Sequence, residues 1–168
     1  STTATLAMGD ALAVALIMLN GFKKEDFAFF HPGGSLGRRM LTKVKDLMHR
    51  GDELPLCFPH TVMLDAVLEI SSKRLGVVIV VDESRKIKGI ITDGDVRRGV
   101  QRYGKEFFDL RASQIMTVNP KTIKEDELAA VALSVMQKYS ITSLIVLDSD
   151  QTLKGLIHIH DILKKGIF

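Results

Sequence analysis

An internal repeat is the feature that most constrains the fold of this chain. Residues 89–99 read GIITDGDVRRG, and residues 155–166 read GLIHIHDILKKG. The offset of 66 residues between the two also places several identical residues on one another: Gly89 on Gly155, Asp82 on Asp148, Ile79 on Ile145, Ala66 on Ala132 and Asp95 on Asp161. Repetition at a fixed spacing indicates a duplicated structural unit.

The two copies differ in length near their start. DLM at 46–48 matches QIM at 114–116 with an offset of 68 residues, so the first copy carries two extra residues around GDELP. Insertions of this size are typical of loops.

Two other interpretations of the repeated motif, a calcium-binding loop and a phosphate-binding loop, are excluded because the residues that each requires are missing. Counted from Asp93, the sixth position of a calcium-binding EF-hand loop would be Arg98, where that loop needs glycine. Neither copy has the Gly-Lys-Ser or Gly-Lys-Thr ending of a nucleotide-hydrolysing phosphate loop. Duplication of a fold is the reading that remains.

Each copy has the same predicted order of elements. A short leading segment, KVKDLM or RASQIM, precedes a helix with apolar residues at i, i+4 and i+8 spacing. A β-branched run, GVVIVVD or SLIVLD, a charged turn and KGIIT or KGLIH then predict two strands, and a last helix follows. We therefore predict an α/β (α+β) fold of two β-α-β-β-α repeats, packed together across a pseudo-two-fold axis.

The composition fits a packed, intracellular protein. Of the 168 residues 46% are hydrophobic, and one cysteine, Cys57, cannot form an intrachain disulfide, which favours a cytoplasmic location. The net charge of +3 favours anionic small ligands. With 6% aromatic residues and no long basic run, we expect no nucleic-acid binding.

The N-terminal residues predict a helix that needs packing partners. Ala11 to Leu19 is unbroken apolar sequence, which is too short to cross a membrane and has no basic residues before it, so we expect neither a signal peptide nor a membrane contact. We interpret it as a buried helix of a larger protein.

The repeat resembles a tandem pair of cystathionine-β-synthase (CBS) domains. The resemblance rests on GIITDGDV and GLIHIHDI, on the strands GVVIVVD and SLIVLD, and on the motifs DLM and QIM. It divides the chain into a first CBS domain at 42–104 and a second at 105–168.

Residues 1–41 are similar to the end of the sugar-isomerase (SIS) domain of bacterial D-arabinose 5-phosphate isomerases. STTATLAMGDALAVALIMLNGF and FHPGGSLGRRML carry this second resemblance. It implies a parent enzyme that interconverts D-ribulose 5-phosphate and D-arabinose 5-phosphate without a cofactor, for Kdo, lipopolysaccharide or capsule synthesis. It also gives His31 a catalytic role and leaves this fragment alone inactive, because the family's other catalytic residues lie upstream.

The candidate ligand-binding residues sit where each second strand meets its last helix. Asp95 could accept hydrogen bonds from ribose hydroxyls while Thr92 and nearby amides hold phosphate. Asp93 in the same turn is a further candidate ligand-binding residue. The alternative is a capping box, since Thr92-x-x-Asp95 has that pattern. The equivalent residues are His158 and Asp161; because histidine is a poor N-cap, capping does not account equally for both acids.

Basic residues after these motifs could attract an anionic ligand into the cleft between the halves. Alternatively, they simply form the solvent-exposed face of a helix. They are Arg97, Arg98, Lys164 and Lys165. The sequence His158-x-His160 holds no third ligand at useful spacing, and its side chains should point apart on a strand or a helix, so we expect no metal site.

The leading hypothesis is a regulatory module that binds AMP, ATP or the nucleotide-sugar CMP-Kdo, attached to an enzyme with a sugar-phosphate substrate. The alternative is an oligomerisation scaffold without a ligand, in which helices at 61–73 and 126–138 pair the module with a second copy. We also expect a homo-oligomer, a dimer or a tetramer.

Overall fold

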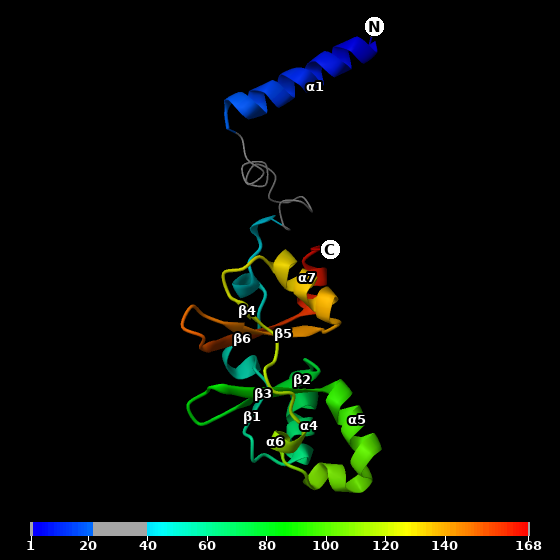
Figure 1. The fold of residues 1–168 in the computed structure, drawn as a ribbon, viewed down its shortest axis with the longest axis vertical. Coiled ribbons are helices and arrows are strands. Elements are labelled where there is room, and N and C mark those ends of the chain that lie inside the picture. The colour runs from blue at the N-terminus through cyan, green and yellow to red at the C-terminus, as the bar shows by residue number, and fades with distance from the viewer. Residues whose placement is uncertain (1, 22–39, 168) are drawn as a thin grey trace.

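The structure is a computed structural model that describes residues 2–21 and 40–167. Its first half contains β1 (Leu56–Cys57), α4 (Met63–Lys73), β2 (Val77–Val81), β3 (Ile87–Thr92) and α5 (Asp93–Tyr103). Its second half contains β4 (Thr122–Lys124), α7 (Ala129–Tyr139), β5 (Ser143–Leu147), β6 (Leu153–His158) and α8 (Ile159–Lys164). The predicted β-α-β-β-α order is therefore confirmed in both copies (Figure 1).

Short helical turns make up the connections. They are η1 (Val44–Asp46), η2 (Gly51–Glu53), η3 (Gly104–Asp109) and α6 (Ala112–Ile115). The two extra residues of the first copy fall around η2, in a connection between elements, as the change of offset predicts.

The two halves contain sheets of one design. The strand orders are β1-β2-β3 and β4-β5-β6, with the first pair of each sheet parallel and the second antiparallel. The registers also match, since Val77 pairs with Thr92 in one sheet and Ser143 pairs with His158 in the other. Every residue of β2 and β5 is buried, because both faces of these central strands are covered.

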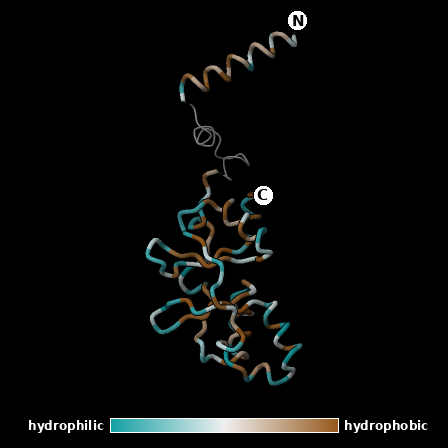
Figure 2. The backbone as a smooth tube through the Cα atoms, viewed as in Figure 1, coloured by the Kyte–Doolittle hydropathy of each residue, from teal (hydrophilic) through white to brown (hydrophobic). Residues whose placement is uncertain are grey.

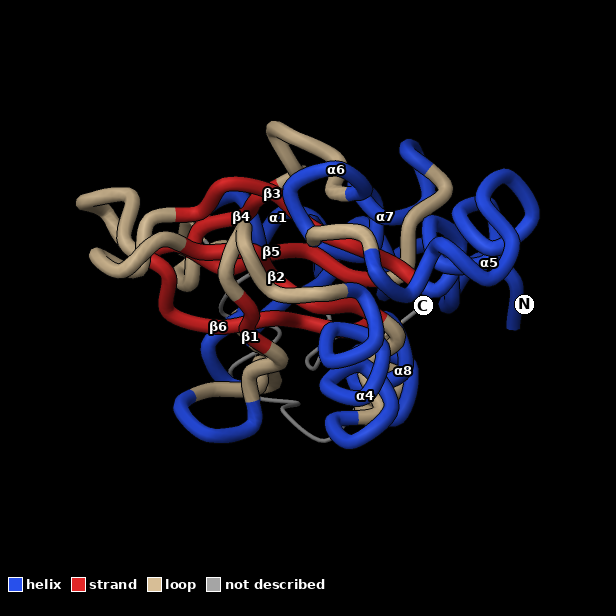
Figure 3. The backbone as a smooth tube through the Cα atoms, turned by 90° about the horizontal axis from the view of Figure 1, so that it is seen from below, coloured by secondary structure: helices blue, strands red, loops and turns tan. Residues whose placement is uncertain are grey.

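One face of each sheet packs against the other sheet. Apolar residues of both halves form a single buried cluster between them: Leu54, Leu75, Val77, Ile79, Val81, Ile145, Leu147 and Leu156. Figure 3 shows the strands gathered at the centre, with the helices around them. The remaining face of each sheet packs on that half's own helices, so each half also has a separate core.

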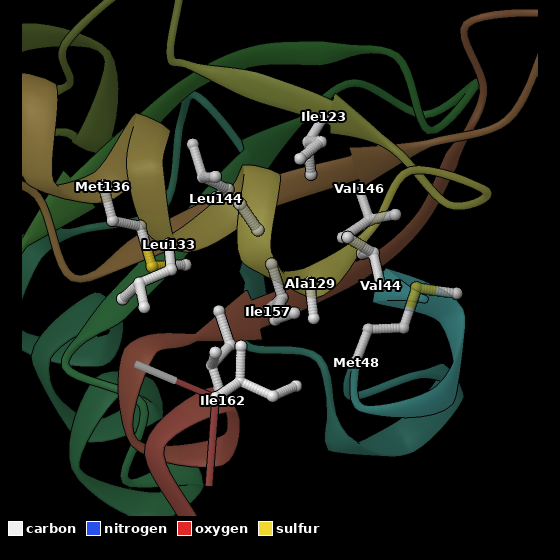
Figure 4. Close-up of a cluster of buried hydrophobic side chains, with 12 residues drawn as sticks. Val44, Met48, Ile123, Ala129, Leu133, Met136, Leu144, Val146, Ile157 and Ile162 are labelled. Atoms are coloured by element: carbon white, nitrogen blue, oxygen red, sulfur yellow. The ribbon is translucent and has the colours of Figure 1, made fainter. Parts of the chain in front are cut away.

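The leading segments are exchanged between the halves. Val44 and Met48, which precede the first half in sequence, lie in the core of the second half with Ile157 and Ile162 (Figure 4). Conversely, Ala112, with Ile115 and Met116, packs in the core of the first half. Neither core is complete without a segment that precedes the other copy in the chain.

The repeated glycines of KGII and KGLI make this exchange possible. A Cβ at Gly155 would lie 2.6 Å from the carbonyl oxygen of His49, and one at Gly89 would lie 2.8 Å from that of Thr117. The leading segment of the opposite half also hydrogen-bonds the next residue of each strand, Ile90 or Leu156. No side chain fits at either glycine, which explains why both copies have one there.

The repeated aspartates before the second strands hold the hairpin turns. Asp82 Oδ1 accepts hydrogen bonds from the amides of Ser84 and Lys86 at 3.0 and 2.9 Å. Asp148 Oδ1 accepts equivalent bonds from Asp150 and Thr152, both at 2.9 Å. These amide bonds stabilise the carboxylate and lower the pKa of both aspartates.

The N-terminal helix α1 (Thr2–Leu19) buries none of its residues. Figure 2 shows apolar residues along its whole length, as expected for a helix whose partners lie elsewhere. With 18 residues, α1 is long and apolar enough to cross a membrane. The sequence-based expectation rested on the nine apolar residues from Ala11 to Leu19 alone, which are too few to do so. Core helices of soluble proteins pass the same test, so the observation is weak evidence for a membrane contact.

Candidate functional site

A cleft of about 700 Å³ opens at the junction of the two halves. It is lined by the start of β2 and β5, the end of β3 and β6, the first turns of α5, and the segment 117–121 that joins α6 to β4. Four of the predicted ligand-binding residues, Thr92, Asp93, Asp95 and Arg97, line it together, and so does His158 from the other half.

Thr92 and Asp95 form the capping box that their spacing predicts. The amide of Asp95 donates to Thr92 Oγ1 at 3.2 Å, and the amide of Thr92 donates to Asp95 Oδ2 at 2.9 Å. The Thr92 hydroxyl adds a third bond to Asp95 Oδ2 at 2.7 Å. The box fixes the carboxylate of Asp95 at the N-terminus of α5.

The second carboxylate oxygen of Asp95 is held less firmly. Arg98 Nη2 donates to Oδ1 at 2.5 Å, and the arginine side chain is 71% exposed while that of Asp95 is 12% exposed. An ion pair with so exposed an arginine contributes only about 0–1 kcal/mol. A carboxylate can accept about four hydrogen bonds, so capping leaves Oδ1 open to a ligand that displaces Arg98.

The charge of the cleft suits an anion. Among its described lining residues, three basic side chains (Arg97, Arg98 and Lys121) outnumber two acidic ones (Asp93 and Asp95). The helix α5 begins at Asp93, and unpaired amides at a helix N-terminus attract negative groups.

The cleft also has an apolar wall, and Lys121 Nζ lies 4.4 Å from the centroid of a ring in it, that of Tyr139. The wall is made of Val77, Ile90, Pro120, Tyr139 and Ile141. The cleft thus combines charged and apolar side chains with Asp95 as a fixed hydrogen-bond acceptor.

His158 behaves differently from the sequence prediction. It caps α8, because Nδ1 accepts a hydrogen bond from the amide of His160 at 3.2 Å, so the expectation that it is a poor N-cap is wrong. The rings of His158 and His160 lie 5.0 Å apart rather than pointing away from each other. The cause is that β6 ends at His158 and α8 starts at Ile159, so neither strand nor helix periodicity holds there.

The environment of His158 favours the neutral ring. Burial, followed by the charge of nearby His160, lowers the pKa of His158 below its ordinary value of 6.5, against the raising effect of Asp161.

Asp161, equivalent to Asp95, is not among the residues that line the cleft. Its Oδ2 lies 3.0 Å from His49 Nε2, and His49 Nδ1 lies 3.1 Å from Glu53 Oε2. His49 belongs to the leading segment that packs on β6. The expected symmetry of the two aspartates is thus broken by this histidine, which stands where the other half has Thr117.

Two further expectations concern the catalytic histidine and metal binding. His31, the residue to which the resemblance gives a catalytic role, lies outside the described residues. Within residues 2–21 and 40–167, no group of three or more His, Cys, Asp or Glu side chains is placed to hold a metal ion.

Apart from His158, sequence reasoning missed the residues that the second half contributes to the cleft. Thr142, Ser143 and the segment 117–121 line it although no motif marks them. The signal that could have found Ser143 is the repeat itself: a hydroxyl stands where the first copy has Val77, in an otherwise apolar strand.

The CBS domain family matches residues 44–102 and 112–167 of this chain. Over 99% of its length the chain is 50% identical to the arabinose 5-phosphate isomerase KdsD of Salmonella typhimurium. It is 47% identical, again over 99% of its length, to those of Pseudomonas aeruginosa and Escherichia coli K12. The chain spans about half the length of these relatives: 50% of the Salmonella protein and 51% of the Pseudomonas protein.

Solved structures share the fold. The CBS-domain protein ATU1752 from Agrobacterium tumefaciens has a TM-score of 0.69 at 24% identity, covering 75% of this chain and 94% of that one. The CBS domain pair of protein MJ0100, solved with 5′-methylthioadenosine and S-adenosyl-L-methionine, has a TM-score of 0.65 at 26% identity, covering 73% of this chain and 98% of that one.

Proposed function

This chain belongs to the CBS domain family, and from that premise we propose that its cleft binds an adenosine nucleotide that regulates an attached isomerase. The observation that carries the proposal is the cleft of about 700 Å³ in which Asp95 is fixed at the start of α5 beside an apolar wall. Each part of a nucleotide finds a chemical counterpart there.

The ribose is assigned to Asp95. Its Oδ2 is occupied by the capping box, and its Oδ1 is bonded to Arg98. Two ribose hydroxyls can take the place of Arg98 at little cost, since that ion pair is exposed. Capping and ligand binding are then compatible roles of one side chain, and Thr92 serves both by holding it still.

The phosphate is assigned to the exposed basic residues of the cleft. Arg97 and Lys121 come from different halves and line the same opening, which the N-terminus of α5 also faces. Charge-assisted hydrogen bonds to a phosphate are the stronger kind. A nucleotide held this way would bridge the two halves.

The adenosine assignment draws on the MJ0100 pair, which was solved with 5′-methylthioadenosine and S-adenosyl-L-methionine. AMP and ATP are the first candidates on this ground, and CMP-Kdo is the alternative that the resemblance to the isomerase family implies. In the second half, we assign Asp161 to the pair with His49, so that one cleft per chain takes the ligand.

The whole protein is proposed to be an arabinose 5-phosphate isomerase with a sugar-phosphate substrate, in the cytoplasm. The identity of 47–50% to proteins of that name supports this, as does the resemblance of residues 1–41 to the end of a SIS domain. His31 would take part in catalysis there without a cofactor. A nucleotide would change that activity only by binding two conformations of the enzyme unequally.

The test is a thermal-shift titration of this chain with AMP, ATP, cytidine monophosphate and CMP-Kdo. At a hundred times its dissociation constant, a specific ligand stabilises the fold by about 2.7 kcal/mol. We expect an adenosine nucleotide to raise the melting temperature with saturation. A flat melting temperature for the whole panel would remove the sensor function.

A second candidate function, a scaffold that pairs two modules, has support from exposed apolar residues. Leu64 and Leu68 lie one turn apart on α4, and Val131 is exposed on α7. Such faces are typical of contacts between copies. Light scattering tests it: we expect a dimer or tetramer, and Leu68→Lys should dissociate it, whereas a wild-type chain that stays monomeric at high concentration would refute the scaffold.

A further inference from the structure

A second hollow, a groove of about 300 Å³, lies between α5 and α6. Its polar lining residues are Asp95, Arg98, Arg102 and Tyr103 from α5 and Gln114 from α6. Spacings of three and four residues put Asp95, Arg98 and Arg102 on one face of the helix. Asp95 and Arg98 also line the cleft, so the two hollows share the ion pair that joins these side chains.

The polar groups of the groove are mostly hydrogen-bond donors. Among its described lining residues, two arginines stand against one acid, Asp95, whose Oδ2 is held in the capping box. Gln114 Oε1 accepts the amide of Arg111 at 2.8 Å, which leaves the two N–H donors of the Gln114 side chain for another partner. Guanidinium groups beside neutral donors are suited to a phosphate group.

Arg102 is the basic residue of the groove with donors to spare. Its Cζ lies 5.2 Å from the centroid of the Tyr103 ring, a cation–π contact that orients the guanidinium. Its side chain makes no ion pair with another residue in the described ranges 2–21 and 40–167. Arg102 is therefore open to an anion from outside the chain.

Arg98 can join Arg102 only when it leaves Asp95. Its Nη2 donates to Asp95 Oδ1 at 2.5 Å, and its side chain is 71% exposed. The ribose of the proposed nucleotide takes that same oxygen, so a filled cleft releases Arg98. The released guanidinium belongs to a residue that already lines the groove, one turn before Arg102 on α5.

We propose that the groove between α5 and α6 is a second anion site, which holds a phosphate group through Arg98 and Arg102 and is coupled to the cleft through Arg98. The site itself rests on the groove, and its coupling rests on the nucleotide function proposed above. A phosphate in the groove and a ribose in the cleft both require the pair of Asp95 with Arg98 to open, so the first to bind removes that cost for the second. Such coupling is reciprocal, and each ligand strengthens the other by the same factor.

Nuclear magnetic resonance of the Gln114 side-chain amide reports on the groove, because Gln114 does not line the cleft. The probes are inorganic phosphate and D-ribulose 5-phosphate at constant ionic strength, and the tighter one shows whether the group is free or carried by a sugar. We expect a saturable shift, and Arg102→Gln should weaken binding about tenfold, the loss typical of a hydrogen bond to a charged group. Arg97→Gln is the matched control, since Arg97 lines the cleft and not the groove; it should change the affinity by less than about twofold, because exposed charges are screened.

Saturating AMP tests the coupling. With AMP bound, the phosphate dissociation constant read at Gln114 should fall about two- to fivefold, the range that one exposed ion pair allows. In Arg98→Gln, which has no ion pair with Asp95 to open, AMP should leave that constant unchanged.

The outcomes separate the site from its coupling and from the nucleotide function. A Gln114 signal that moves with neither probe, or one that saturates equally in Arg102→Gln, would overturn the anion site. An unchanged phosphate dissociation constant in wild type with AMP bound would overturn the coupling through Arg98. If wild type binds no AMP, the nucleotide function fails, and the titration without AMP still decides whether the groove binds phosphate.

Discussion

Gly155→Ala tests the exchange of leading segments on which the cleft depends. An added Cβ would lie 2.6 Å from the His49 carbonyl oxygen and 2.7 Å from Met48 Sδ. The methionine end can move, but the carbonyl cannot without disturbing two hydrogen bonds, His49 N to Leu156 O at 2.8 Å and Leu156 N to His49 O at 3.1 Å.

The size of the effect follows from these contacts. Each backbone hydrogen bond contributes about 0.5–1.5 kcal/mol, and overpacking a tight site costs about 1–3 kcal/mol. The expected loss is therefore about 2–6 kcal/mol of the free energy of unfolding. With a urea dependence of about 2 kcal/mol per molar, the midpoint of unfolding should fall by about 1–3 M.

Circular dichroism during urea titration measures this midpoint. Gly9→Ala is the matched control, because a Cβ at Gly9 in α1 meets nothing within 4 Å. It should leave the unfolding of the two halves unchanged. A Gly155→Ala midpoint equal to that of Gly9→Ala would refute the packing of the first leading segment on β6.

Three further predictions concern single residues. Burial, with a smaller contribution from Glu69, raises the pKa of the Cys57 thiol to about 11. A thiol reagent at pH 7.5 should therefore leave the native protein unmodified, and in denaturant it should react with one thiol per chain. Reaction of the native protein at the rate of a free thiol would contradict this. Because folding lowers the pKa of His158, the unfolded chain binds more protons than the folded chain below about pH 6.5, and the contribution of His158 to stability is present above that pH and is lost as the pH falls. His158→Gln should therefore lose less stability than wild type between pH 7 and 5. An identical decline would refute the lowered pKa of His158. Gly99→Ala would place a Cβ 2.1 Å from buried Phe107 and should lower the urea midpoint of unfolding. The double variant with Phe107→Leu should recover part of that midpoint, because the smaller side chain leaves room for the Cβ. A double variant whose midpoint does not recover would contradict the contact.

The repeat predicts most of the fold because each copy is recognised from short stretches of neighbouring residues. Runs such as VVIVV and SLIVL mark strands, and the registers of the two sheets are equivalent, as the constant offset requires. Thr92 and Asp95 were predictable for the same reason, since a capping box depends on residues three apart.

What the sequence could not predict depends on contacts between distant residues. The pair of His49 with Asp161 joins positions 112 residues apart, and no period in the chain relates them. The exchange of leading segments has the same origin, although the two glycines that permit it are visible in the repeat. The rings of His158 and His160 meet because a strand changes to a helix between them, where neither periodicity applies.

Calorimetric titration of AMP into wild type, Asp95→Asn and Asp161→Asn tests the central claim most directly. The Asn side chain removes the charge but keeps an oxygen, for the capping box at position 95 and for His49 at position 161, so the fold of both variants should persist. We predict one AMP per chain for wild type, binding weakened at least tenfold in Asp95→Asn, and unchanged binding in Asp161→Asn. Loss of binding in Asp161→Asn with full binding in Asp95→Asn would contradict the account.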